Sequence, residues 1–134
     1  MASIGNNSIE GQINLQVTPV SANYTVTVTD DVVQVTTGSS TIAVSLPAPV
    51  PAGSFTPGSS DPTGNGNNNT LGSVGNQGQR VTVEKVDTGA GTVVVDGVLP
   101  GYIRASGKVT LAHNGSSVTF VSDGTFWNCL GTVS

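Results

Sequence analysis

The chain has 134 residues with only 9% charged side chains and a formal net charge of −4. Its four basic residues, Arg80, Lys85, Arg104 and Lys108, form no basic stripe, so we expect no nucleic-acid partner. No apolar run approaches the length of a membrane span, and the first residues lack the pattern of a secretory signal. Glycine, proline, valine, threonine, serine and asparagine dominate instead, which predicts one all-β domain with almost no helix. So little charge favours packing into an assembly.

Residues 1–22 are predicted to form an extended N-terminal arm, and residues 23–134 the single β domain. In the arm, Ile13, Leu15 and Val17 alternate with polar residues, which predicts a short strand that ends at Pro19. A strand at a chain end can join its own sheet or the open sheet edge of another molecule. Since no local hairpin partner is evident, we expect the second arrangement.

Three segments with alternating apolar residues follow, at 24–29, 33–35 and 42–46. In the first, Tyr24, Val26 and Val28 are expected to face inward. Asp30 and Asp31 then form a turn, in which two solvated carboxylates are the simplest interpretation. Calcium binding by this pair is an alternative, because hard cations prefer carboxylate oxygens, although no calcium-loop motif surrounds it.

Residues 47–79 are predicted to form a long surface loop rich in proline, glycine and asparagine. Five of the seven prolines lie here, followed by the polar run at 64–69. Bulky side chains are scarce, and Phe55 is the aromatic one that we expect to meet a partner. A connection of this length is uncommon in a compact domain and is usually functional or disordered.

Shorter segments complete the domain. Residues 80–86 and 92–95 are predicted to pair as a hairpin through the turn at 87–91, and residues 109–111 to begin another strand. The eight or nine strands together predict a small antiparallel β-sandwich or a jelly-roll-like domain.

The segment 117–129 is predicted to form a hairpin around Asp123 and Gly124, because Asp-Gly between apolar runs is a strong signal for a two-residue turn. This turn sets Phe120 opposite Trp127, the expected core anchors, and Val118 opposite Cys129. We expect Cys129 to be a small buried apolar residue.

Val121 and Phe126 occupy the other face of this hairpin. A hairpin that is apolar on both faces needs cover on both sides, so we expect one face on the core and the other against a neighbouring copy. A two-layer sandwich that is complete within one chain is the alternative.

No catalytic or metal site is evident. His113 is the only histidine and Cys129 the only cysteine, which leaves a zinc site short of ligands and excludes an internal disulfide. No nucleophile elbow is present. A glycan hydrolase would need two carboxylates at a suitable distance, for which Asp30, Asp96 and Asp123 are candidates. We therefore expect no enzyme activity and no cofactor.

Five segments, in this order, resemble a module that is common in structural proteins of tailed phages. They are the valine strand at 31–35, the apolar strand ending in Leu-Pro at 42–47, V-T-V-x-K-x-D at 81–87, T-V-V-V-D-G at 92–97 and V-T-x-V-S-D-G-T-x-W at 118–127. The last is the most specific, and the resemblance covers about three-quarters of the chain. It departs from the module at 47–79, where the module usually has a short link.

The resemblance implies a virion protein that is typically a homotrimer. Because the chain is little more than the module, it looks like a capsid decoration (cement) protein on the outer capsid surface, with its own copies and the major capsid protein as partners. The residues expected at trimer or capsid contacts are Ile13, Leu15, Val17, Phe55, Val121 and Phe126. The alternative is a fibre or head appendage that binds a host-surface glycan or receptor, with Tyr24, Tyr102 and Phe55 as the candidate aromatic contacts.

Overall fold

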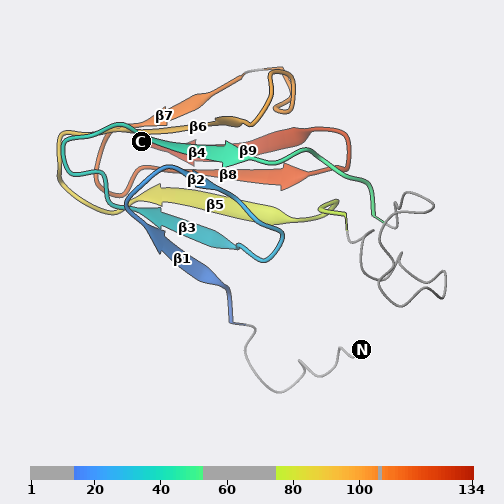
Figure 1. Cartoon of the computed structure of the whole chain (residues 1–134), viewed down its shortest axis with the longest axis horizontal. Helices are drawn as coiled ribbons and strands as arrows, with labels where there is room; N and C mark the ends of the chain where they lie inside the picture. The colour runs from blue at the N-terminus through green and yellow to red at the C-terminus, as the bar shows by residue number, and fades with distance from the viewer. Residues whose placement is uncertain (1–13, 53–74, 106) are drawn as a thin grey trace.

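The computed structural model describes residues 14–52, 75–105 and 107–134, and within them the fold is all-β, with two sheets and no helix (Figure 1). No helix that could span a membrane occurs in these ranges. The five-stranded sheet has the spatial order β1 (Val17–Val20), β3 (Val32–Val35), β5 (Arg80–Lys85), β8 (Ser117–Ser122) and β9 (Trp127–Val133). The four-stranded sheet has the order β2 (Tyr24–Thr25), β4 (Ile42–Leu46), β6 (Val93–Gly97) and β7 (Val109–Leu111). Two layers of sheet agree with the predicted sandwich-like architecture.

The first six strands alternate between the two sheets along the chain, which makes their sheet neighbours parallel. β1, β3 and β5 are parallel to one another, and so are β2, β4 and β6. Among the strands in the described ranges, only the pairs β5–β8, β6–β7 and β8–β9 are antiparallel. The prediction of an antiparallel sandwich was therefore wrong for these six strands. Two parallel neighbours in one sheet are connected by way of a strand in the opposite sheet, so the connection needs no helix.

The prediction that residues 80–86 and 92–95 pair as a hairpin was also wrong, because β5 and β6 lie in different sheets. The turn at 87–91 crosses between the sheets and packs closely on the preceding crossover at 36–41. A Cβ atom at Gly91 would lie 2.0 Å from the carbonyl oxygen of Ser40, and one at Gly89 would lie 2.1 Å from that of Gly38. Glycine at both positions permits the close stacking of the two turns.

The strand at the N-terminal end was also expected to join another molecule. Instead, β1 pairs in parallel with β3 of the same chain, with Val17 beside Val32 and Val20 beside Val35. The two strands lie near each other because the polypeptide returns through β2 in the opposite sheet. Residues 1–13 of the predicted arm and residues 53–74 of the predicted loop lie outside the described ranges.

The core between the sheets is built mainly from valines at alternate strand positions. Phe120 and Trp127, the expected core anchors, are both fully buried, and the Trp127 indole N–H donates to the carbonyl oxygen of Pro47 at 2.8 Å. Val26 also lies in the core, whereas Val28, predicted to face inward, is 54% exposed because β2 ends at Thr25. Full burial of one such side chain contributes roughly 1.5–3 kcal/mol.

The β8–β9 hairpin differs from its predicted register by two residues. Ser122 faces Trp127 and Phe120 faces Cys129, so Phe120 and Trp127 are not directly opposite. The tip of the turn moves one residue along the chain, to Gly124 and Thr125, and this shifts each strand pairing by two residues. The Asp123 carboxylate stabilises this turn by accepting the backbone N–H groups of Thr125 and Phe126, each at 2.8 Å.

Cys129 is exposed, contrary to the prediction of a buried residue. β9 is an edge strand, and the ladder shifts by one residue opposite Thr119 and Phe120. From Cys129 to the end of the strand every residue is exposed, so the alternation of buried positions that holds elsewhere stops here.

Candidate interaction surface

The outer face of the five-stranded sheet points away from the core and is covered by no described strand. Strand register defines its rows of side chains, and one row contains Val17, Val32, Thr82, Thr119 and Gly131. A second row contains Pro19, Gln34, Glu84, Ser117 and Val133, and a third contains Arg80, Val121 and Asn128. Thirteen positions therefore include only two charged side chains, Glu84 and Arg80.

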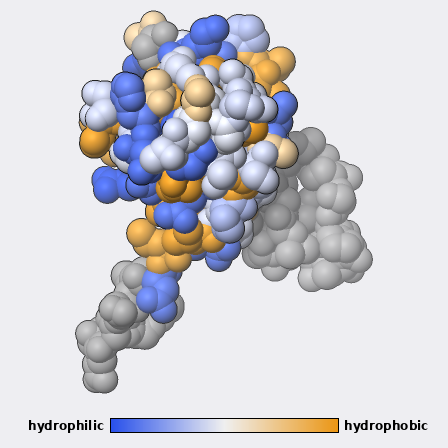
Figure 2. All heavy atoms as spheres, turned by 90° about the vertical axis from the view of Figure 1, so that its left-hand side faces the viewer, coloured by the Kyte–Doolittle hydropathy of each residue, from blue (hydrophilic) through white to orange (hydrophobic). Residues whose placement is uncertain are grey.

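Apolar side chains are exposed at both edges of this sheet. At the β1 edge, Leu15 is 60% and Val17 46% exposed, and at the β9 edge, Leu130 is 52% and Val133 60% exposed. Figure 2 shows apolar atoms gathered at the lower edge of the molecule, where β1 lies in Figure 1. Neither edge strand contains a charged residue, although charge is a common protection of open edges.

A groove of about 610 Å³ adjoins the β1 edge. Leu15, Val28 and Val32 give it apolar walls, and residues 75–80 form much of the remainder. Asp31 also lines it and accepts the backbone N–H of Gln16 at 2.7 Å, which fixes the chain beside Leu15. The groove can therefore receive an apolar side chain from outside the described chain.

The residues that the sequence predicted for contacts are distributed over this surface. Leu15 and Val17 lie at one edge, Val121 is half-buried on the outer face, and Phe126 is half-buried in the β8–β9 turn. Ile13 and Phe55 lie outside the described residues. The sequence interpretation missed Leu130 and Val133, since a strand continuing through a register shift gives no simple alternating pattern.

Arg104 covers Phe126 and links the turn to β9. Its guanidinium carbon lies 4.4 Å from the ring centroid, its Nη2 donates to Asp123 at 2.8 Å and its Nε to Asn128 at 2.7 Å. The Asn128 amide, the backbone N–H groups of Phe126 and Thr125, and then Arg104 hold the pKa of Asp123 well below its usual range. A cation over an aromatic ring contributes about 0.5–1 kcal/mol at an exposed site.

Asp30 is only 3% exposed, so the prediction of a solvated turn carboxylate was wrong for this residue. Its oxygens accept hydrogen bonds from the Thr18 hydroxyl at 2.6 Å, the Tyr24 hydroxyl at 2.7 Å and the Thr27 N–H at 2.8 Å. Burial raises the pKa of Asp30, but these hydrogen bonds outweigh it and the pKa is lowered. The Asp30 carboxylate therefore connects the β2–β3 turn to Thr18 of β1.

The other acidic residues considered for metal binding or hydrolysis have separate partners. Asp96 accepts the backbone N–H of Gly97, and Asp123 binds Arg104 and Asn128. Within the ranges that the structure describes, no three His, Cys, Asp or Glu side chains are grouped so as to hold a metal ion.

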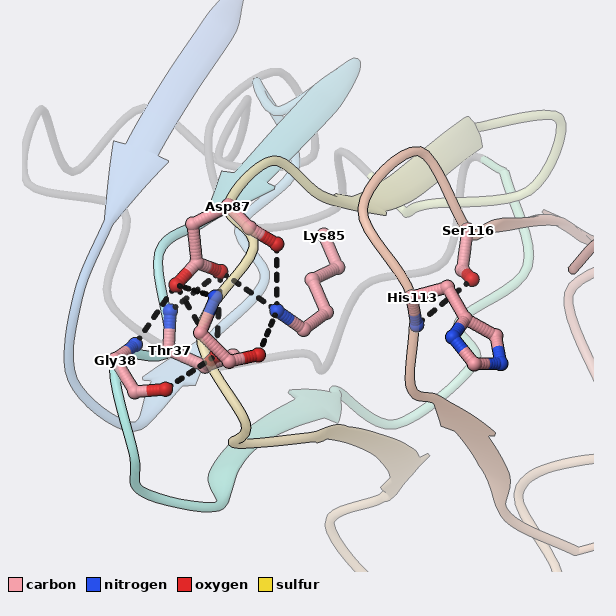
Figure 3. A network of polar contacts seen from close by, with 7 residues as sticks. Thr37, Gly38, Lys85, Asp87, His113 and Ser116 are labelled. Carbon is pink, nitrogen blue, oxygen red and sulfur yellow. Dashed lines mark hydrogen bonds and ion pairs between the residues drawn. The ribbon is translucent and has the colours of Figure 1, made fainter.

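A polar network joins the two crossovers at 36–41 and 86–92 (Figure 3). The Lys85 ammonium is fully buried and donates to the Asp87 carboxylate at 2.8 Å and to the carbonyl oxygens of Asp87 and Gly89 at 2.7 and 3.0 Å. Asp87 also accepts the backbone N–H groups of Thr37 and Gly38. Lys85, the backbone N–H of Thr37 and then that of Gly38 keep the pKa of Asp87 well below its usual range, with burial opposing them.

The fold and this surface define an all-β domain of two mixed sheets with exposed apolar sheet edges. Comparison with family models, with curated proteins and with solved structures found no match for this chain.

Proposed function

We propose that this protein is a non-enzymatic structural protein of a virion, a capsid decoration (cement) protein that forms a homotrimer on the outer capsid surface. The observation that carries the proposal is the outer face of the five-stranded sheet, which has few charges and exposes large apolar side chains at both of its uncharged edge strands. Association would remove these side chains from water and would also pair the open strand edges. The resemblance to phage structural modules supplies the virion context.

Binding to the shell would stabilise it by mass action. A protein that binds the assembled shell, and not its dissociated subunits, shifts the equilibrium toward the shell as its concentration rises above the dissociation constant. Residues 1–22 and 47–79, Val121 and Phe126 are the parts proposed to contact the major capsid protein or neighbouring copies. This mechanism needs no cofactor and no nucleic acid or membrane.

The test uses purified shells that lack the protein. We expect saturable binding at a fixed number of copies per shell, counted by quantitative gel densitometry, and a higher temperature of shell disruption. Deleting residues 1–13 leaves β1 and the Thr18–Asp30 hydrogen bond in place, so the deletion should weaken shell binding while the melting temperature of the free protein stays unchanged. Failure of the full-length protein to bind any shell would contradict the proposal.

A receptor-binding or glycan-binding appendage remains the second candidate from the sequence. Its aromatic contacts would include Tyr24 and Tyr102, but both pack against the core and the Tyr24 hydroxyl is bound to Asp30. No described residue therefore favours this candidate over decoration. Copy number separates the two, because decoration requires many copies over the shell and an appendage only a few.

A further inference from the structure

We propose that copies of this chain associate head to tail, with the β9 edge of one copy paired in parallel with the β1 edge of the next. This inference rests on the proposed function only for the expectation that three copies form a closed ring. It concerns the residues that join the copies, which are Leu15 and Val17 on one side and residues 129–133 on the other.

Strand direction is the first support. β1 is parallel to β3 and β5, β8 is antiparallel to β5, and β9 is antiparallel to β8, so β9 runs in the same direction as β1. A copy placed beside another in the same orientation therefore brings its β1 next to β9 as a parallel pair. This is the same pairing that β1 already makes with β3.

The two edges also expose similar side chains on the same face. Val17 shares a row with Gly131 through the ladders of the sheet, and Val133 lies two residues beyond Gly131, so Val17 and Val133 both belong to the outer face. Pairing β9 with the next β1 would extend this face without interruption. The exposed apolar side chains of the two edges would then cover one another.

The two edges have open stretches of similar length. On β9, the N–H and carbonyl of Trp127 are already bound to Tyr102 and Arg104, so the open part begins after this residue. On β1, the carbonyl of Gln16 accepts from Val32 at the start of β3 and that of Val20 from Thr36 just after β3. The backbone groups of Val17 and Pro19 therefore point away from β3, although Pro19 has no N–H to donate. Each edge therefore offers a short open stretch, residues 129–133 and residues 15–18.

Charge at the ends of these stretches is compatible with the parallel arrangement. Asp31 lies beside Gln16 at the start of β1, and Arg104 lies beside Trp127 at the start of β9. A parallel pair brings Asp31 to the same end of the interface as Arg104, whose guanidinium is bound to Asp123 of its own chain. A second groove, of about 280 Å³, lies between β7 and residues 132–134 at the end of β9.

Cysteines placed on the outer face of both edges provide the test, because Cys129 pairs with the buried Phe120 and so faces the opposite side of the sheet from Val17. Neighbouring strands lie about 4.8 Å apart, which is within the Cα separation that a disulfide spans. We would oxidise the Val17→Cys/Gly131→Cys and Val17→Cys/Val133→Cys variants, both carrying Cys129→Ser, free and bound to shells, and separate the products on non-reducing gels; a Cβ added at Gly131 meets no atom within 4 Å. Linked dimers and trimers are expected for at least one variant, and none for the proteins that carry only one of its two introduced cysteines.

Other products would overturn the inference. Linked wild-type dimers would show that β9 meets β9 about a two-fold axis, and linked Val17→Cys/Cys129→Ser dimers would show that β1 meets β1. The absence of links in both variants, free and on shells, would exclude contact between these edges. Head-to-tail links in a protein that binds no shell would contradict the proposed function alone.

A charged variant gives an independent measurement that does not depend on disulfide geometry. Wild type should sediment as an oligomer in sedimentation velocity, and Val133→Lys should abolish that oligomer while leaving the melting temperature of the monomer unchanged, because Val133 is exposed. Val98→Lys is the matched control, since Val98 is a similarly exposed valine on neither edge. An unchanged oligomer in Val133→Lys would overturn the inference.

Discussion

The Lys85 ammonium and the Asp87 carboxylate lie 2.8 Å apart and form an ion pair that links the crossovers at 36–41 and 86–92. Lys85 is fully buried, whereas the Asp87 side chain retains 20% exposure. The pair is therefore asymmetric, because loss of either partner leaves the other in a different environment. Removal of Lys85 leaves a carboxylate that reaches water, and removal of the Asp87 charge leaves a buried cation.

This asymmetry predicts an order of stabilities. Lys85→Met keeps the length of the side chain but leaves two carbonyls without their donor, so it should lower the free energy of unfolding by about 2 kcal/mol. Asp87→Asn should be more destabilising, because a buried ammonium loses its counter-charge. Urea titrations of both variants and of the double variant would measure the coupling. An equal or smaller effect of Asp87→Asn would contradict the asymmetry.

Acid should destabilise the protein below about pH 4. The pKa values of Asp87 and Asp123 are lowered from 3.8, by Lys85 first in one case and by Asn128 first in the other. A lowered pKa in the folded state means that the carboxylate stabilises the fold above the unfolded pKa and that this contribution disappears as the pH falls below it. Melting temperatures between pH 7 and pH 2 should be level at first and then decrease.

The Asp87→Asn variant is the control for this acid dependence, because an amide does not titrate. Its melting temperature should be lower at pH 7 and should decrease less steeply below pH 4 than that of the wild type. Identical slopes for the two proteins would show that Asp87 does not contribute to the acid transition.

The strands were predictable from the sequence, but their assignment to sheets was not. Alternating valines such as Val81 and Val83 identify a strand with one buried face, and this pattern is the same in antiparallel and parallel sheets. The turn at 87–91 was interpreted as a hairpin because a short glycine-containing connection is typical of one. Its true role depends on stacking against residues 36–41, which is a contact between segments distant in sequence.

The candidate surface was predictable only in part. Leu15 and Val17 follow from local alternation, whereas their exposure depends on the position of β1 at a sheet edge. Leu130 and Val133 were missed because the ladder shifts within β9, so period-two alternation no longer tells which side chains are exposed. The Asp123–Gly124 signal located the hairpin correctly, but the Asp123 side chain closes the turn one residue later than expected.

Alanine at Gly91 should destabilise the stacked crossovers. Its Cβ would lie 2.0 Å from the Ser40 carbonyl oxygen, so one backbone segment must move, and overpacking of this kind costs about 1–3 kcal/mol. Gly131→Ala is the matched control, because no atom lies within 4 Å of its added Cβ. Thermal unfolding of both variants measures the difference. A Gly91→Ala protein as stable as Gly131→Ala would show that the two crossovers are not closely stacked in solution.

The hydrogen bond between the Tyr24 hydroxyl and Asp30, 2.7 Å long, should be visible in the titration of tyrosine. The bond to Asp30 and then burial raise the pKa of Tyr24 above its ordinary value of 10.0. Absorbance at alkaline pH should therefore show a late ionisation of Tyr24. Tyr24→Phe should remove that phase and lower the unfolding free energy by about 1 kcal/mol. Tyr102→Phe is the control, because the hydroxyl of Tyr102 makes no hydrogen bond to any described residue, and it should leave the late phase intact. If the late phase disappeared in Tyr102→Phe instead, it would belong to Tyr102. The titration would then give no support for the hydrogen bond by which Asp30 holds Tyr24.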